Sequence, residues 1–403
     1  MTILYPTQQQ VLDQAEPSYL YNLGTSSGKT LISIYHYVLH SEGEPLLVVQ
    51  PPQKLKTGEW ADEIKTVENA ENIKINYVQM SVGMLAKKWQ EYKGYFVIID
   101  EAHMVKTPTS KRGKAALHLT RASTNFVLLT ATAAATWEDT MNYFLMWNFY
   151  KNKTQFLKEH AIYGDMYLGD RVIKKPVDWK EQDELKHKFN SFSIKKETTY
   201  FVDLPDTQVK DISFKASKEY SNILRDRVLE LDDETILFDT QPKLQAGLRY
   251  HTNQKDKLSY TEMLASGTTE NILIFYQFTK EKDNLLQVFK KLKKKVFEVN
   301  GQNFHLPSKD ERKTLKNSVT ICQYQSGSAA IELQYCNQVI IYTPSYSYID
   351  YTQALGRAVR HGNKNKVTIY RYITNKTIEP SVYKALNHKK DFTEQLFKKG
   401  VGI

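Results

Sequence analysis

The stretch best suited to chemistry is a loop of small residues, GTSSGKT, at residues 24–30. In such a loop, backbone N–H groups can point at phosphate oxygens, a lysine can reach the outer phosphates of a nucleotide, and a hydroxyl can bind Mg²⁺. Gly28, Lys29 and Thr30 meet these needs where an apolar, helix-like segment begins. The usual phosphate-loop pattern would place its first glycine at Leu23, so a plain turn before a helix is the alternative.

Two adjacent carboxylates form a second candidate site. The segment VIIDEAH, residues 97–103, reads as an apolar strand that ends in Asp100 and Glu101. An aspartate at a strand tip can hold Mg²⁺, partly through water, and the neighbouring glutamate can orient and deprotonate an attacking water. The alternative is an ordinary acidic turn after a strand. It is the poorer interpretation, because a phosphate loop precedes this strand in the sequence.

Two arginines near the end of the chain form a third candidate, within QALGRAVRHG at residues 353–362. Arg357 and Arg360 are three residues apart, so on a helix they are expected to project from one face. Guanidinium groups can neutralise charge on a phosphoryl group during its transfer. Gln353 is expected to help place the γ-phosphate or the attacking water. A bare pair of solvated arginines on a surface helix is the alternative.

The elements that would position these residues are strands of a parallel sheet. Short apolar runs alternate with amphipathic stretches, which is typical of a sheet covered by helices. The pattern weakens over residues 151–196 and then returns. The apolar runs are residues 46–50, 95–100, 126–130, 271–278, 319–324, 338–343 and 367–373.

The order of these motifs resembles that of superfamily 2 helicases and translocases over nearly the whole chain. DEAH is followed by TAT at residues 130–132 and by the arginine segment. Within the superfamily, the SNF2-like branch is the most similar. LYPTQ, residues 4–8, resembles the start of that branch, in which the glutamine, here Gln8, contacts adenine. PPQKLKTGEWADEI has the Pro, Leu and Trp-x-x-Glu spacing of its next motif, and the segment from DYTQALGRAVRHG to TIE resembles its ending.

The sequence also departs from the SNF2-like pattern. Ser26 stands where the loop usually has glycine, Thr107 replaces an asparagine, TATAA replaces the usual T-G-T-P, and the glutamine expected after Gly362 is missing. The segment between Thr132 and Ile272 is short beside that of insertion-rich chromatin remodellers, and no histone-reading module is recognised. We therefore expect a compact motor of a phage or mobile-element type.

The resemblance implies an α/β fold of two tandem RecA-like lobes, with parallel sheets flanked by helices and ATP bound in the cleft between them. Residues 1–197 would form the first lobe, with a trailing helical segment, and residues 198–403 the second, with a helical insertion. The implied cofactors are ATP and Mg²⁺, with Thr30 and Asp100 binding the metal, partly through water. The residues expected to bind ATP are Gln8, Gly24, Thr25, Ser26, Ser27, Gly28, Lys29 and Thr30. The expected catalytic residues are Glu101, Asp100, Lys29, Arg357, Arg360 and Gln353.

Composition favours a polyanionic partner, because the formal net charge is +10 and the isoelectric point is near 9.1. We expect DNA, with duplex favoured over single strands and RNA disfavoured, bound by a monomer. Ser81, Gly327 and Ser328 are candidate contacts to nucleic acid. The lysine-rich run KKLKKK, residues 290–295, could also contact a phosphate backbone, although a solvated helix face is the preferred interpretation.

The two cysteines, Cys322 and Cys336, offer neither a disulfide framework nor a metal cluster. No secretion signal or long apolar run is recognised, so we expect a protein of the cytoplasm, that of the host if the protein is viral. With 403 residues, 41% of them hydrophobic, the chain can form two cores, since single cores stop growing at roughly 250–300 residues.

The expected function is a nucleic-acid-dependent ATPase that moves along or remodels DNA, in replication or recombination of a phage or mobile element. Replication or recombination proteins are candidate partners. Two alternatives stay open: a strand-separating DNA or RNA helicase, and a catalytically weak DNA-binding scaffold. Strand separation usually requires a wedge, and the short middle segment leaves little chain for a hairpin. The intact lysine, carboxylates and arginines disfavour the scaffold.

Overall fold

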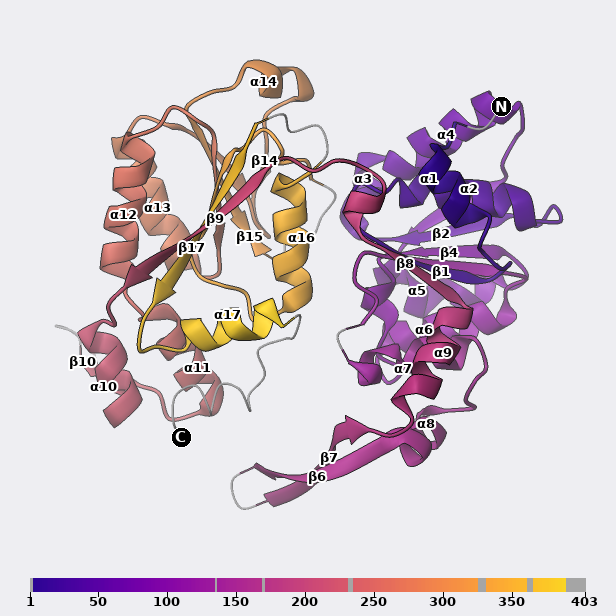
Figure 1. Ribbon diagram of the computed structural model, residues 1–403, viewed down its shortest axis with the longest axis horizontal. Helices are drawn as coiled ribbons and strands as arrows, with labels where there is room; N and C mark the ends of the chain where they lie inside the picture. Colours follow the sequence, from indigo (N-terminus) through magenta and orange to yellow (C-terminus); the bar gives the residue numbers. More distant parts are fainter. Residues whose placement is uncertain are drawn as a thin grey trace. The chain divides into compact units, whose positions relative to one another are not determined.

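The structure is a computed structural model that describes residues 3–134, 136–168, 171–230, 235–324, 331–360 and 365–388. It contains two compact units, Met1–Asp203 and Leu204–Ile403 (Figure 1). The division predicted from the sequence, between residues 197 and 198, falls a few residues earlier. Each unit has one large β-sheet with a hydrophobic core on each of its two faces.

The sheet of the first unit has six strands in the order β3-β2-β4-β5-β1-β8, and every pair of neighbours is parallel. Four of the strands, β1, β2, β4 and β5, are completely buried, which explains why the last three read as apolar runs rather than as alternating patterns. The strands are β1 (Tyr19–Leu23), β2 (Leu46–Gln50), β3 (Tyr77–Ser81), β4 (Phe96–Asp100), β5 (Phe126–Thr130) and β8 (Ser193–Lys196).

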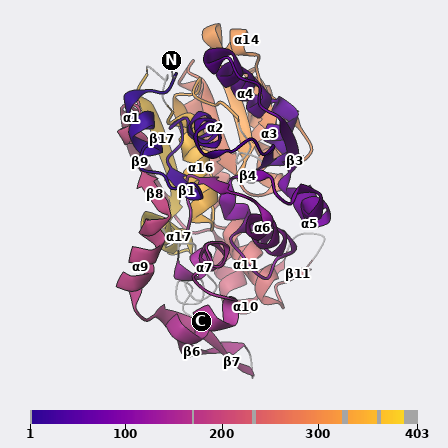
Figure 2. The same ribbon diagram turned by 90° about the vertical axis from the view of Figure 1, so that its right-hand side faces the viewer.

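Helices cover both faces of this sheet (Figures 1 and 2). One face packs against α1 (Pro6–Leu12), α2 (Lys29–His40) and α4 (Glu59–Glu71). The other packs against α5 (Val82–Lys88), α6 (Lys111–Ala122) and α7 (Trp137–Met146). The short helix α3 (Pro52–Thr57) precedes α4, and three 3₁₀ turns complete the unit: η1 (Trp89–Tyr92), η2 (Ala102–Val105) and η3 (Thr198–Tyr200).

The segment that trails the first sheet contains a β-hairpin as well as helices. Between α8 (Lys153–His160) and α9 (Gln182–Ser191), the antiparallel strands β6 (Ala161–Leu168) and β7 (Arg171–Trp179) project beyond the rest of the unit (Figures 1 and 2). The expectation that little chain remains for a hairpin is therefore wrong. The strand signal in the sequence is weak because Pro176 interrupts β7 and a bulge shifts the register.

The sheet of the second unit has seven strands in the order β14-β13-β15-β12-β16-β17-β9. All neighbours are parallel except β13 and β14. The strands are β9 (Thr207–Phe214), β12 (Ile272–Tyr276), β13 (Lys295–Val299), β14 (Phe304–His305), β15 (Ser318–Gln323), β16 (Gln338–Ile341) and β17 (Val367–Thr374). A small separate hairpin is formed by β10 (Val228–Glu230) and β11 (Thr235–Leu237).

Helices also cover both faces of the second sheet. One face packs against α12 (Gln254–Ser266) and α13 (Thr279–Lys291). The other packs against α10 (Lys218–Asp226), α11 (Gln241–Tyr250), α16 (Tyr348–Ala358) and α17 (Glu379–Asn387). The short helix α14 (Lys309–Thr314) precedes β15.

Both units are thus α/β, with parallel sheets flanked by helices, and this part of the predicted fold is confirmed. The ATP cleft between two lobes stays a prediction. The seven apolar runs recognised in the sequence all form strands of these two sheets. Within the described ranges, no helix is both long and apolar enough to cross a membrane.

A buried ion pair fastens two helices of the second unit. Lys257 on α12 lies 2.5 Å from Glu379, the first residue of α17, and neither side chain is accessible to solvent. The other carboxylate oxygen of Glu379 accepts the backbone N–H of Thr374 at 2.7 Å. Buried charges are costly unless they are paired and hydrogen-bonded, so each partner depends on the other.

We expect Glu379→Ala to lower the free energy of unfolding by about 3–5 kcal/mol, because Lys257 would be left buried without its counterion. The double variant Lys257→Met/Glu379→Leu should lose much less unfolding free energy, because no buried charge is left unpaired. As a control, Asp239→Ala, which breaks the exposed pair with Lys243, should lower the unfolding free energy by less than about 1 kcal/mol. Denaturant unfolding measures all three. Equal losses in the single and double variants would contradict this account.

Candidate functional site

The predicted site residues of the first unit gather at one edge of its sheet. Because the strands are all parallel, their carboxyl ends share an edge, and ligands of open α/β sheets bind outside that edge. The loop of residues 24–28 leaves β1 there, Asp100 ends β4, Thr130 ends β5 and Ser81 ends β3. Tertiary structure therefore brings together motifs that are far apart in the sequence.

The loop between β1 and α2 has the backbone of an anion-binding turn. Ser26 and Gly28 both adopt left-handed conformations, with φ of 60° and 73°. Lys29 is the first residue of α2, so the free N–H groups of the first helical turn lie directly behind the loop. Ser27 is buried, and its hydroxyl finds no hydrogen-bond partner among the described residues. These features suit a loop that wraps phosphate.

Helix α1 is fastened to this loop through Gln8. The side-chain amide of Gln8 donates to the carbonyl of Ser27 at 3.0 Å, and its oxygen accepts the backbone N–H of Tyr5 at 2.9 Å. A Cβ atom on Gly28 would lie 2.2 Å from Nε2 of Gln8, so a side chain there must displace the end of Gln8, and the φ of 73° also favours glycine. Both ends of the amide thus contact the chain itself, and the expected contact of Gln8 with adenine stays a prediction.

The first residue of the loop, Gly24, packs against the segment that follows β8. The N–H of Gly24 donates to the carbonyl of Lys196 at 2.9 Å. A Cβ atom on Gly24 would lie 2.3 Å from the hydroxyl of Thr198, in η3. Glycine is therefore required by close packing against the segment that follows β8. The sequence identifies Gly24 only through the loop pattern, and the neighbour that imposes glycine lies far along the chain.

Asp100 is fully buried at the end of β4 and is surrounded by hydrogen-bond donors. Its Oδ2 accepts from Nζ of Lys54 at 2.7 Å and from Nε1 of Trp60 at 3.2 Å. Its Oδ1 accepts the backbone N–H of Glu101 at 2.9 Å. Lys54 is a site residue that the sequence analysis missed. One lysine among several in PPQKLKTGEW carries no pattern that would distinguish it.

Glu101 adopts a left-handed conformation, with φ of 54°, and its side chain is buried. Burial by itself would raise its pKa, but the contact with His103 at 3.3 Å and the positive charges of Lys54 and Lys29 outweigh burial. The pKa of Glu101 is consequently held well below its ordinary value, so the carboxylate is ionised at neutral pH. The phosphate loop and the carboxylate pair follow β1 and β4, which only β5 separates in the sheet.

The oxygen atoms at this edge suit Mg²⁺. The hydroxyl of Thr30 and the carboxylate of Asp100 are hard oxygen ligands, and Asp100 already accepts the ammonium group of Lys54, so it is placed to bind a cation. In the described ranges no cluster of three or more His, Cys, Asp or Glu residues could hold a metal by itself. A magnesium ion at Asp100 would therefore take most of its ligands from water and from nucleotide phosphates.

In the second unit, the structure corrects one prediction about the arginines. Arg357 and Arg360 do not share a helical face, because α16 ends at Ala358 and Val359 leaves the helical conformation at φ −86° and ψ 80°. Arg360 lies in the loop that follows. Gln353 and Arg357 are four residues apart on α16 and do share a face. Burial raises the pKa of the Cys322 thiol, and the positive charge of Arg357 opposes that rise.

The candidate contacts to nucleic acid are only partly described. Ser81 ends β3 directly before α5. Gly327 and Ser328 lie outside the described residues, as does the departure at residues 361–363.

The lysine-rich run ends α13 and begins β13, and three of its cations have partners. Lys291 pairs with Glu262, Lys295 pairs with Glu311, and Lys294 is buried and donates to the carbonyl of Thr268. These contacts favour the structural interpretation of the run over phosphate binding.

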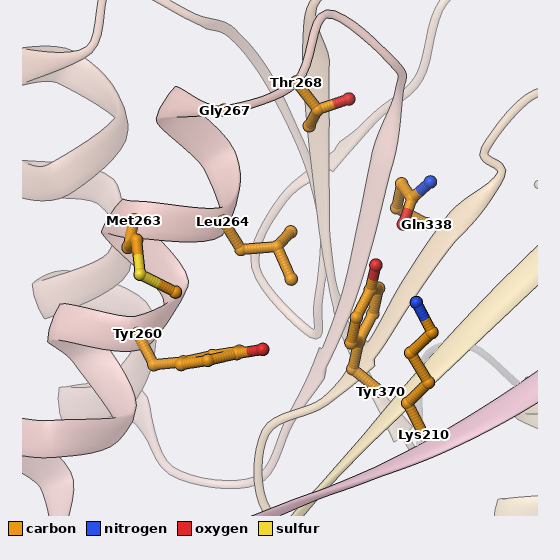
Figure 3. A pocket seen from close by; sticks show the side chains of 8 residues that line it. All are labelled: Lys210, Tyr260, Met263, Leu264, Gly267, Thr268, Gln338 and Tyr370. Atoms are coloured by element: carbon orange, nitrogen blue, oxygen red, sulfur yellow. The ribbon is translucent and has the colours of Figure 1, made fainter.

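A cavity of about 440 Å³ lies in the second unit, away from these residues (Figure 3). Tyr260 projects into it from α12, and Lys210 and Tyr370 line it from β9 and β17. Gln338, which begins β16, closes one side, so the cavity lies toward the amino ends of the strands. Helix α16, with Gln353 and Arg357, follows the carboxyl end of β16, and the cavity therefore takes no part in the candidate site.

Residues 254–362 match the family described as "Helicase conserved C-terminal domain". The matched segment lies within the second unit, begins at α12 and includes Gln353, Arg357 and Arg360.

Several curated proteins are similar to the chain. It is 30% identical to the ATP-dependent helicase fft3 of Schizosaccharomyces pombe over 33% of its length and 15% of that protein. It is 23% identical to the DNA excision repair protein ERCC-6-like of Danio rerio over 78% of its length and 28% of that protein. It is 26% identical to human DNA excision repair protein ERCC-6 over 52% of its length and 16% of that protein. The chain thus spans less than a third of each of these relatives. These similarities support the resemblance to SNF2-like superfamily 2 ATPases.

Among solved structures, the Sulfolobus solfataricus SWI2/SNF2 ATPase core in complex with dsDNA is similar to this chain. The two are 19% identical, the TM-score is 0.42, and the match covers 99% of this chain and 92% of the other.

We expect Gly28→Ala to destabilise the first unit more than Gly58→Ala does. Both glycines have φ near 72°, so each alanine costs about 1–2 kcal/mol in backbone strain. A Cβ on Gly58 meets nothing within 4 Å, whereas one on Gly28 must displace Gln8, which adds about 1–3 kcal/mol. Denaturant unfolding provides the comparison. Equal losses would show that the contact between Gln8 and the loop contributes nothing.

Proposed function

We propose that this chain is a DNA-dependent ATPase that couples ATP hydrolysis to movement along DNA. The observation that carries the proposal is the convergence of Lys29, Asp100 and Glu101 at one edge of the first sheet, where an ionised buried carboxylate lies beside a phosphate-binding loop. It is supported by the helicase C-terminal domain, by similarity to ATP-dependent helicases and DNA excision repair proteins, and by the net charge of +10.

In the proposed reaction, the backbone N–H groups of residues 24–30 bind the phosphates and Lys29 neutralises their outer charge. Glu101 is proposed to orient the attacking water and to accept its proton as the phosphoryl group is transferred. The carboxylate is ionised and held in position, and its lowered pKa makes positioning the larger part of this role. Thr30 and Asp100 would hold Mg²⁺, which would neutralise phosphate charge when bound. Gln353, Arg357 and Arg360 are proposed to act on the transferred phosphoryl group.

Two substitutions test the roles in the first unit. We expect Lys29→Ala and Glu101→Gln each to lower ATP turnover by about a hundredfold or more, since both groups act mainly on the transition state. DNA affinity measured without nucleotide should barely change and serves as the control for folding. If a variant kept more than about a tenth of wild-type turnover, the role assigned to the substituted residue would be wrong.

The arginines are tested separately. Arg357→Ala and Arg360→Ala should each lower kcat about a hundredfold or more while ATP binding changes by a few-fold at most, because their charge is needed when negative charge shifts during transfer. Steady-state kinetics with equilibrium binding of ATP separates the two effects. If ATP affinity and turnover fell by the same factor, Arg357 and Arg360 would instead be ligands of the bound ATP or structural residues.

The β6–β7 hairpin favours strand separation as a second candidate function. A two-stranded hairpin has little stability by itself, and four of its large apolar side chains are exposed: Ile162, Tyr163, Val172 and Val177. Lys174 and Lys175 are exposed between them. An apolar, basic projection of this kind could insert at a duplex junction.

One experiment separates the two functions. ATPase activity is measured without polymer and with single-stranded DNA, duplex DNA and RNA, and unwinding of a forked duplex is measured in parallel. A matched variant replaces residues 162–178 with Gly-Gly, which joins the paired residues Ala161 and Trp179.

For a duplex-tracking motor, we expect duplex DNA to stimulate the ATPase at least as well as single strands, and RNA much less. The stimulation should decrease steeply with salt, because phosphate contacts release counterions. The wild type should unwind the fork poorly, and the hairpin variant should keep its duplex-stimulated ATPase. Robust unwinding that disappears in the hairpin variant would establish the second function instead.

We further propose that the protein is a compact motor of phage or mobile-element type that acts in replication or recombination. The short segment between Thr132 and Ile272 supports this proposal. Expression timing and co-purification with replication proteins from the source would test it.

A further inference from the structure

The ion pair formed by Lys54 and Asp100 occupies the carboxylate that is proposed to bind Mg²⁺. Nζ of Lys54 lies 2.7 Å from Oδ2 of Asp100, and the side chains are 11% and 0% exposed. Trp60 donates to the same oxygen, and the N–H of Glu101 donates to Oδ1. Both oxygens of the expected metal ligand are thus engaged by donors of the chain itself.

Competition at Asp100 follows from these contacts. A buried carboxylate needs a counterion, and Lys54 supplies one. Two cations near one carboxylate oxygen repel each other strongly in a site of low polarity, so Lys54 and a metal ion cannot both occupy their best positions. Lysine suits an exchangeable partner, because its ammonium group is compact and strongly hydrated and its stem is flexible.

The helix that carries Lys54 is weakly anchored. Helix α3 has only six residues, none of them fully buried, and it ends at Gly58 in the left-handed conformation. It packs against β3, whose last residue is Ser81, a candidate contact to nucleic acid. A segment with so little buried surface can shift at low cost, so a change at Lys54 can reach the end of β3.

We propose that Lys54 is an exchangeable counterion: it pairs with Asp100 when no metal is bound and yields the carboxylate to Mg²⁺ when nucleotide is loaded. Its release frees α3 and so links occupancy of the nucleotide site to the edge that carries Ser81. This inference rests on the proposed function, because it takes Asp100 as a ligand of the metal.

The first test measures the Mg²⁺ requirement for binding a fluorescent ADP analogue. In Lys54→Met the competing charge is gone, so the half-saturating Mg²⁺ concentration should be about fivefold or more lower than in the wild type. Lys54→Arg should raise it, because a guanidinium holds a carboxylate through two hydrogen bonds. Lys56→Met, an exposed change on the same helix, should leave it unchanged.

The second test distinguishes exchange from a merely structural ion pair. Lys54→Met should lower Tm in EDTA, because Asp100 loses its counterion, and saturating Mg²⁺ and ADP should remove most of that deficit. A deficit of the same size under both conditions would overturn the proposal. If Lys54→Met does not fold, an unchanged or lower Mg²⁺ requirement in Lys54→Arg would overturn it equally.

Failure of this inference differs from failure of the proposed function. If the wild type binds no ADP analogue at any Mg²⁺ concentration, the nucleotide site itself is wrong and the inference is overturned with it. If the wild type binds the analogue in an Mg²⁺-dependent way and Lys54→Met has the same Mg²⁺ requirement, only the exchange is overturned.

Discussion

Asp100 is a fully buried carboxylate at the end of a central strand, and it is stable there only because donors surround it. Lys54 and Trp60 come from the segment after β2, so the charge on Asp100 fixes that segment against the tip of β4. The backbone N–H of Glu101 donates to Asp100, so the carboxylate of Asp100 also holds Glu101 in place. The positions of both carboxylates in the candidate site depend on how this one charge is neutralised.

Residues with positive φ are spread along the chain, and two of the non-glycine ones lie at the same edge of the sheet as Asp100. Ser26 and Glu101 are non-glycine residues in the left-handed region, and Gly28 lies there too. Such conformations cost energy and persist where the surrounding structure enforces them, which is common at functional sites. Here the enforcing contacts are Gln8 against the loop and His103 against Glu101. Strain and a buried charge therefore coincide where ATP is proposed to bind, as expected when a site is arranged for chemistry rather than for stability.

The β6–β7 hairpin and the segment that matches a helicase C-terminal domain bear on different parts of the proposed function. The match of residues 254–362, together with the similarity to an ATP-dependent helicase, supports the proposed ATPase. The hairpin bears on what the proposed motor would do to a duplex, and its exposed apolar side chains belong to neither core cluster of the first unit in the described ranges. A fold does not fix function, so the role of the hairpin must be argued from its own residues.

The sequence determined seven strands of the two large sheets, because strands buried on both faces of a parallel sheet read as apolar runs. It also determined the phosphate-loop residues, because such a loop needs small residues, a lysine and a hydroxyl. It also indicated Asp100 and Glu101, whose adjacency is local. Tertiary structure alone decided the contacts between distant segments: Lys54 with Asp100, Gln8 with the loop, and Thr198 against Gly24. It also decided where α16 ends, which removed Arg360 from the helix, and it revealed a hairpin whose strand pattern Pro176 obscures. Residue spacing shows which side chains of a helix or strand are buried, because burial follows the period of the element. Contacts between segments far apart in the sequence depend on how the chain folds back, which residue spacing does not show.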